Sequence, residues 1–187
     1  MAESRAEAQA AYESTLAHQS ETVYQGRVVT LRVDTITKPD GHSYKREVIV
    51  HSGAVVMVPV DAEGKIILVR QWRRAAARIL TELPAGTLEP PEEPIACADR
   101  ELQEEIGYKA NKITPLGGFF SAPGFCTEYL HLFLAEDLSE SQLAPDDNEA
   151  IDVLRVTLDE ALEMIGSGEI CDAKSVAGIL RYRFLKS

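Results

Sequence analysis

The sequence predicts an α+β fold with mixed sheets and few helices. Apolar and polar residues alternate through much of residues 23–50, which is the period of half-buried strands. Apolar residues over 95–106 recur at helical spacing instead. Two more helical segments follow near the end, over residues 158–165 and 173–184. A chain of 187 residues is long enough for one domain with a core of its own.

The first half of the chain is expected to be mostly strands. Residues 1–20 contain few large apolar side chains to dock them, so we predict a mobile or peripheral arm. A hairpin then covers residues 23–50, with its turn at Lys38-Pro39-Asp40-Gly41, because Pro presets φ and Gly tolerates a positive φ. Residues 54–60 and 65–71 are predicted to form a second strand pair around the turn 61–64.

The second half begins with a short extended piece at 81–84 and the helix at 95–106. Pro91 and Pro94 suit the start of that helix, and Gly107 suits its end. The remaining expected elements, in order, are strands over 112–120 and 129–135, an acidic loop over 138–148, a strand over 151–157 and the two final helices, parted at 166–168.

Composition excludes several classes of protein. The net charge of −11 opposes a nucleic-acid-binding face, because a phosphate backbone would be repelled. No apolar run approaches the roughly 18 residues of a membrane helix, and the first 20 residues lack the pattern of a secretory signal. Three widely spaced cysteines are typical of reduced thiols in a cytoplasm. An acidic protein with an acidic substrate would need local basic residues or a metal.

Three glutamates crowd the predicted helix: Glu101, Glu104 and Glu105. The pair at 101 and 105 faces the same way, and two like charges at this spacing destabilise a helix by about 0.2–0.5 kcal/mol. A hard divalent cation reverses that sign, because Mg²⁺ binds carboxylate oxygens together with substrate phosphates. Arg100 can hold Glu104 in place, and Gly86 lets the backbone present a carbonyl to the metal. A solvated acidic face is the alternative explanation for the three glutamates alone.

The complete spacing over residues 86–108, GTLEPPEEPIACADRELQEEIGY, resembles the signature of the Nudix hydrolase superfamily, and we call it the box. Only its last position, Tyr108, departs from the pattern, which prefers an aliphatic residue there. The segments YKREVIVHSGAVVMVPV, LVRQWRRA, ELPAG and FFSAPGFCTEYLHLFLAEDL, with Pro123 15 positions after Tyr108, resemble the ADP-ribose pyrophosphatase branch. The tail DDNEAIDV…SGEICDAKSVAGIL resembles this branch as well.

The resemblance implies a Nudix-type α/β/α sandwich with a mixed sheet and an N-terminal β-hairpin subdomain. We therefore expect an arm over 1–20, a dimerising β subdomain over 21–50 and the hydrolase domain over 51–187. The implied reaction is Mg²⁺-dependent hydrolysis of ADP-ribose to AMP and ribose 5-phosphate, with Mn²⁺ as the alternative ion. A broader nucleoside diphosphate sugar hydrolase, acting on GDP-mannose or ADP-glucose, and a non-catalytic ADP-ribose sensor stay open as alternatives.

The resemblance also implies roles for single residues. Metal ligands would be Glu101, Glu105 and the carbonyl of Ala85, with Glu104 assisting in binding and catalysis. The general base would come from the acidic loop, as Glu149 or Asp147, with Glu128 as the third candidate. Substrate contacts would come from Arg46, Glu47, Arg73, Gly86 and Tyr44. A homodimer is implied, in which the KREV strand crosses to the partner.

Overall fold

The computed structural model describes residues 4–89, 91–144 and 150–186. The chain forms two compact units. The N-terminal unit comprises Met1–His51 with Ala122–Thr127, and the main unit comprises Ser52–Ser121 with Glu128–Ser187. The box at residues 86–108 therefore belongs entirely to the main unit.

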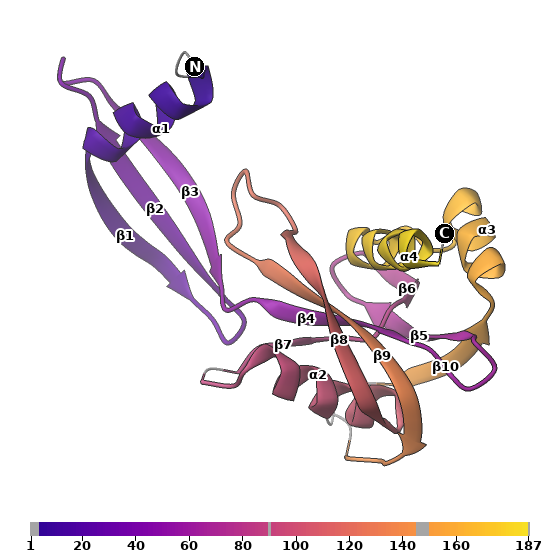
Figure 1. Ribbon diagram of the computed structural model, residues 1–187. Coiled ribbons are helices and arrows are strands. Elements are labelled where there is room, and N and C mark those ends of the chain that lie inside the picture. Colours follow the sequence, from indigo (N-terminus) through magenta and orange to yellow (C-terminus); the bar gives the residue numbers. More distant parts are fainter. Residues whose placement is uncertain (1–3, 90, 145–149, 187) are drawn as a thin grey trace. The chain divides into compact units, whose positions relative to one another are not determined.

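The N-terminal unit contains a three-stranded antiparallel sheet and a helix (Figure 1). In chain order its elements are α1 (Arg5–Thr15), β1 (Ala17–Gln25), β2 (Val29–Thr37) and β3 (Ser43–His51). The predicted turn between β2 and β3 is confirmed. Gly41 has a φ of 87°, and its N–H donates to the carbonyl of Lys38 at 2.9 Å.

At the start of the chain, residues of the expected arm form α1 and part of β1. Ser4 and Glu7 cap α1 reciprocally: the Ser4 N–H donates to Glu7 Oε2 at 2.8 Å, and Glu7 N–H donates to Ser4 Oγ at 3.2 Å. All side chains of β1 are exposed, so no alternation marks this strand in the sequence. Its backbone pairing with β2 makes the expected hairpin three-stranded.

The main unit contains two sheets. The first is mixed and has the order β7-β4-β9-β8, with β4 and β9 parallel and the other pairs antiparallel. Its strands are β4 (Ala54–Pro59), β7 (Ala85–Thr87), β8 (Tyr108–Phe120) and β9 (Tyr129–Glu140). The second sheet is antiparallel, in the order β10-β5-β6, with β5 (Ile66–Arg73), β6 (Arg78–Glu82) and β10 (Ile151–Val156).

The expected pairing of residues 54–60 with 65–71 is wrong. β4 and β5 lie in different sheets, and only one isolated bridge, Val60 to Ile66, joins them beside the turn. Both strands carry long buried apolar runs. Strands that are apolar on both faces suit the centre of a covered sheet better than a half-exposed hairpin, and each is flanked by two other strands.

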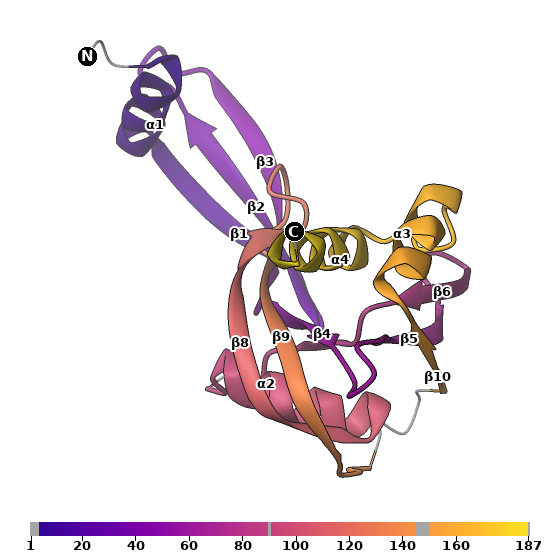
Figure 2. The same ribbon diagram turned by 45° about the vertical axis from the view of Figure 1, so that its right-hand side comes forward.

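Helices cover both faces of the mixed sheet, as Figure 2 shows for α2 (Pro94–Glu101) and α4 (Ala173–Leu185). Val55 and Met57 of β4 pack in one apolar cluster with Ala98 of α2. Val56 and Val58 point to the opposite face, in a cluster with residues of α4 and of α3 (Leu158–Ser167). The predicted α+β sandwich with a mixed sheet is thus confirmed, and so are the two C-terminal helices.

The box helix is confirmed but not uniform. It is α-helical from Pro94 to Glu101 and continues as a π-helical turn from Leu102 to Ile106. Gly107 ends it with a φ of 73°, a left-handed conformation that favours glycine. Among the described residues, no helix is long and apolar enough to cross a membrane. All three cysteines are free thiols.

Candidate active site

The site is built where the box helix meets the short strand β7. Gly86 pairs with Val55 of β4 in this strand. A Cβ at Gly86 would overlap the carboxyl group of Glu101, so only glycine leaves room for this side chain. The sequence predicted that Gly86 lets the backbone turn and present a carbonyl to the metal. The structure shows a second role for Gly86, which is to leave space for the carboxyl group of Glu101.

Glu105 reaches the same strand from the π-helical turn. Its Oε2 accepts a hydrogen bond from the Ala85 N–H at 3.0 Å, and only 8 % of the residue is exposed. Glu101 and Glu105 therefore both lie against the Ala85–Gly86 backbone. This juxtaposition brings together the two carboxylates and the peptide segment that the sequence nominated as metal ligands.

Arg100 organises the remaining box carboxylates. Its Nη1 donates to Glu101 Oε1 at 2.7 Å and to Glu104 Oε2 at 2.8 Å. Its Nε and Nη2 donate to the two oxygens of Glu92 at 3.0 and 3.1 Å. The predicted contact of Arg100 with Glu104 is confirmed, and the bonds to Glu101 and Glu92 add to it. Arg100 thus ties the carboxylate that lies against Gly86 to those of Glu92 and Glu104.

The charges shift the acidities of this cluster. Hydrogen bonds from Arg100 lower the pKa of Glu92 below its ordinary value of 4.5. The hydrogen bonds with Glu92 are likewise the largest cause that raises the pKa of Arg100, whose guanidinium stays protonated. One cation, Arg100, is thus shared by the carboxylates of Glu92, Glu101 and Glu104.

Cys97 is a box residue that the sequence did not single out. It is fully buried, with Sγ 3.6 Å from the carbonyl of Thr87 and 3.4 Å from Arg100 Nη2. Burial, and then the nearby charge of Glu92, raise its pKa to about 12. The thiol is therefore neutral and packs the helix against β7. In the sequence, only its position on the apolar side of the helix indicated that Cys97 is buried.

The π-helical turn is held from outside by residues that follow β9. The Gly107 N–H bonds to the carbonyl of Leu102, which leaves the carbonyl of Gln103 for other donors. Leu143 N–H and Gln142 Nε2 both donate to it at 3.2 Å. Gln142 also crosses Gly107 so closely that a Cβ there would lie 2.5 Å from its Oε1. The φ of the last box glycine favours glycine, and a Cβ there would also displace the end of the Gln142 side chain.

Arg73, nominated for phosphate binding, lies at the end of β5 and is bound to a buried carboxylate. Its Nε and Nη2 donate to Glu82 Oε2 at 3.0 and 2.7 Å. Lys174 of α4 reaches the same oxygen at 3.0 Å. Glu82 and Lys174 were missed in the sequence, because their neighbours come from distant parts of the chain.

The other nominated substrate residues lie in the N-terminal unit, on β3. Arg46 and Glu47 are exposed, and the Arg46 guanidinium stacks on the Tyr44 ring at 4.9 Å. The Tyr44 hydroxyl donates to Glu13 of α1 at 3.2 Å. Partial burial, followed by the charge of Glu13, raises the pKa of Tyr44 above 10.0. Tyr44 is therefore a neutral ring that holds Arg46 on one side.

Three candidates for the general base remain. Glu128 is half-buried in the main unit, directly before β9. Glu149 and Asp147 lie outside the residues that the structure describes.

A divalent cation fits this donor set. Two carboxylates and a backbone carbonyl, completed by phosphates and water, are ligands that Mg²⁺ commonly takes in phosphoryl-transfer sites. Within residues 4–89, 91–144 and 150–186, no group of three or more His, Cys, Asp or Glu side chains is arranged around a common metal position. The two carboxylates of Glu101 and Glu105 are a smaller set than that, and the carbonyl of Ala85, phosphates and water would complete a metal shell around them.

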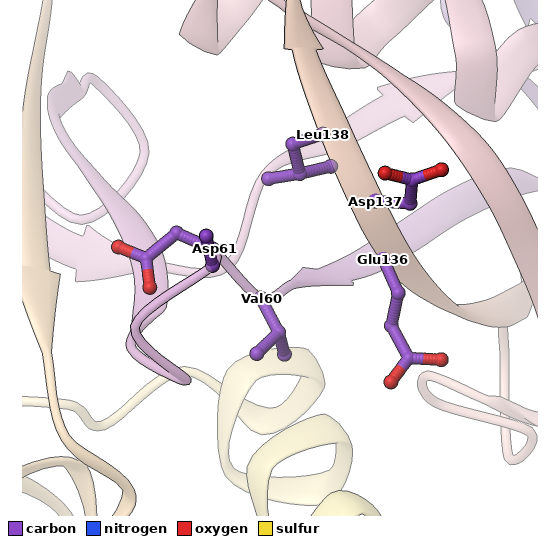
Figure 3. Close-up of a pocket in the computed structure, with 6 residues that line it drawn as sticks. Val60, Asp61, Glu136, Asp137 and Leu138 are labelled. Carbon is purple, nitrogen blue, oxygen red and sulfur yellow. The ribbon is translucent and has the colours of Figure 1, made fainter.

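A second acidic group lies elsewhere in the main unit, in a pocket of about 280 Å³ (Figure 3). Asp61, Glu136 and Asp137 line it together with apolar residues. Asp61 accepts from the N–H groups of Glu63 and Lys65 in the β4–β5 turn, and Glu136 pairs with Lys112 at 2.6 Å. The carboxylates of Asp61 and Glu136 thus serve turn and strand structure, and none of the three residues belongs to the box.

Comparison with known proteins adds to this geometry. The NUDIX domain model matches residues 50–177, and the model of the nucleoside diphosphate sugar hydrolase N-terminal domain matches residues 17–49. The ADP-ribose pyrophosphatase of Bacillus subtilis is 44 % identical over 89 % of this chain and 90 % of its own length. The methanol dehydrogenase activator of Bacillus methanolicus is 40 % identical over 86 % and 88 %. The GDP-mannose pyrophosphatase of Klebsiella pneumoniae is 37 % identical over 79 % of each.

Among solved structures, the crystal structure of an ADP compounds hydrolase superposes with a TM-score of 0.81. The match covers 91 % of this chain and 94 % of that one, at 24 % sequence identity. At this identity the likeness is evidence for the fold alone.

Proposed function

The chain belongs to the NUDIX domain family and is a Nudix pyrophosphohydrolase, and we propose that it hydrolyses the pyrophosphate bond of ADP-ribose to AMP and ribose 5-phosphate. The observation that carries this proposal is the convergence of Glu101 and Glu105 on the Ala85–Gly86 backbone. The relative named as an ADP-ribose pyrophosphatase, at 44 % identity, supports the choice of substrate.

Enzymes of this family need a divalent metal, and we propose Mg²⁺, with Mn²⁺ as a substitute. Glu101, Glu105 and the carbonyl of Ala85 would hold it, with Glu104 assisting. When bound, the cation neutralises phosphate charge and lowers the pKa of a coordinated water. This chemistry resolves the conflict between a net charge of −11 and an anionic substrate.

The chain's own residues supply the other parts of the reaction. Arg100 holds Glu101 and Glu104 in fixed orientations, so little reorganisation is needed when substrate binds. Arg73, with Arg46 and Glu47 from the N-terminal unit, would bind the phosphates and the nucleoside, and Tyr44 would orient Arg46. A loop carboxylate, Glu149 in first place and Asp147 or Glu128 after it, would take the proton of the attacking water.

One alternative stays within hydrolases. The GDP-mannose pyrophosphatase relative favours a broader activity on nucleoside diphosphate sugars, including GDP-mannose and ADP-glucose. A sensor that binds ADP-ribose without cutting it is disfavoured, because such a module gains nothing from a complete set of box carboxylates.

We also propose a homodimer. Among residues 4–51, only Leu16 is buried, and the outer strand β1 is exposed along its whole length. Val23 and Tyr24 on this strand are 56 % and 60 % exposed. A sheet with so little core and an open edge gains stability when a second copy covers it. The three free thiols favour a cytoplasmic location, and the acidic charge disfavours nucleic acid as a partner.

A panel of substrates tests the activity. ADP-ribose, GDP-mannose, ADP-glucose, NADH, diadenosine polyphosphates and nucleoside triphosphates are incubated with Mg²⁺, and kcat/KM is compared. We expect ADP-ribose or another diphosphate sugar to exceed diadenosine polyphosphates and triphosphates by at least about tenfold, a gap of about 1.4 kcal/mol. A preference for triphosphates would contradict the proposed substrate class but not the assignment to the Nudix family. Light scattering at micromolar concentration tests the dimer, and a fully active monomer would refute it.

A further inference from the structure

The C-terminal motif GEICDAKS, residues 168–175, contacts the end of β6 through the first turn of α4. Asp172 caps this helix, because its Oδ2 accepts from the Ser175 N–H at 3.2 Å. The same oxygen binds Lys174 Nζ at 2.9 Å. Lys174 Nζ also lies 3.0 Å from Glu82 Oε2 at the end of β6. The cap thus fixes a lysine against a strand that runs toward the box.

Glu82 is the centre of this cluster. Only 2 % of the side chain is exposed, and one of its oxygens binds both Arg73 and Lys174. A buried carboxylate needs such partners, because an unpaired charge in the interior is strongly unfavourable. Arg73 binds it through Nε and Nη2, the fork geometry that fixes the plane of a guanidinium.

A backbone contact fastens the same region. Ser175 is fully buried, and its Oγ accepts from the Leu83 N–H at 2.7 Å. Leu83 follows Glu82 and precedes Ala85 by two positions. The first turn of α4 therefore holds both the carboxylate that binds Arg73 and the peptide that leads to the expected metal site.

We propose that Lys174 is a positioning residue for phosphate binding by Arg73, and that it acts through Glu82. This inference rests on the proposed hydrolysis of a diphosphate substrate. The Lys174 side chain is 14 % exposed and lies between two carboxylates, Glu82 and Asp172, whereas 37 % of the Arg73 side chain is exposed. Glu82 holds the guanidinium of Arg73, and Lys174 on the same oxygen holds Glu82 in place, so that Arg73 keeps one orientation. Asp172 balances the charge of Lys174, which therefore acts on Arg73 by position.

Kinetics of Lys174→Met with ADP-ribose and Mg²⁺ test this role. We expect KM to rise about tenfold and kcat to change less than twofold, because Arg73 would bind the diphosphate equally in the ground and transition states. Lys174→Arg should restore most of the affinity. Lys174→Gln, which keeps a donor without the charge, gives an intermediate KM and serves if the methionine variant does not fold.

A double-mutant cycle separates positioning from general stability. In an Arg73→Ala background, Lys174→Met should leave KM unchanged while it still lowers Tm. Lys112→Met is the matched control, because it breaks an exposed lysine–glutamate pair of 2.6 Å on β8 and β9. That control should leave KM at the wild-type value.

Two outcomes would overturn the proposal: an equal rise of KM with and without Arg73, or a loss of Tm with no change in KM. Calorimetric titration with ADP-ribose in EDTA keeps the test separate from the proposed function. If the wild type binds ADP-ribose without cutting it, the reaction is wrong, while weaker binding by Lys174→Met still supports the positioning role. Equal binding by both proteins in EDTA counts against it.

Discussion

The backbone of Gly86 and the carboxyl group of Glu101 occupy adjoining space, so closely that a single Cβ at position 86 would overlap the carboxyl atoms. Gly86→Ala should therefore displace Glu101 and lower kcat/KM by about 10²-fold, the cost of a misplacement of about 1 Å at a reacting centre. Gly166→Ala is the control, because a Cβ on this helical glycine meets nothing within 4 Å. It should keep full activity and hold or raise Tm. Similar kinetics for both variants would show that Glu101 does not need its present position.

Glu105→Gln should remove most activity and leave the fold intact. The amide oxygen can still accept from the Ala85 N–H, while the charge that would hold a metal is lost. We expect kcat to fall by about 10²–10⁴-fold, since a bound metal supplies several kcal/mol of charge stabilisation. The free energy of unfolding should stay the same or rise, because the substitution removes the repulsion between the negative charges of Glu101 and Glu105. Glu163→Gln, on an exposed position of α3, is the control. Activity within tenfold of wild type at saturating Mg²⁺ would contradict the metal role.

Glu92→Gln should make the stability of the protein less dependent on pH. Arg100 lowers the pKa of Glu92 below 4.5, so the ionised carboxylate stabilises the folded state. This contribution is complete above pH 4.5 and is lost as the pH falls through the lower pKa of the folded protein. We expect Glu92→Gln to be less stable than wild type by about 1–3 kcal/mol at pH 7, with a smaller difference near pH 3. Urea unfolding at both pH values measures this, and a constant difference would exclude the carboxylate charge as its source.

The acidic loop gives a prediction from the sequence. If Glu149 takes the proton from water, Glu149→Gln should lower kcat by about 10²–10⁴-fold and change substrate Kd only a few fold. Asp146→Asn should have almost no effect and is the matched control. Small, equal effects of both substitutions would direct the search for the base to Glu128 or to the box.

The sequence predicted the box well because its contacts are local. Arg100 and Glu104 are four residues apart on one helix, and spacing alone gives their proximity. The strands of the core were located by their apolar runs. However, β4 and β5 were wrongly paired, because a run that is apolar on both faces does not indicate which strand lies beside it. Glu82 and Lys174 meet through tertiary structure. Leu83 and Ser175 bond across 92 positions, and no period in a single sequence reports such a contact.

The π-helical turn at Leu102–Ile106 bears on how the box can be moved between proteins. A π-helical turn contains more residues than an α-helical one, so each residue rotates by less than the roughly 100° of an α-helix. A sequence motif fixes only the number of residues between Glu101 and Glu105. The direction in which Glu105 points toward Ala85 depends on the rotation per residue of the helix. A box grafted onto an ideal α-helix, without a counterpart of Gln142 and Leu143 to bind the carbonyl of Gln103, would keep every letter and point Glu105 in another direction. Transplanting this chemistry therefore requires the segment after β9 as well as the box.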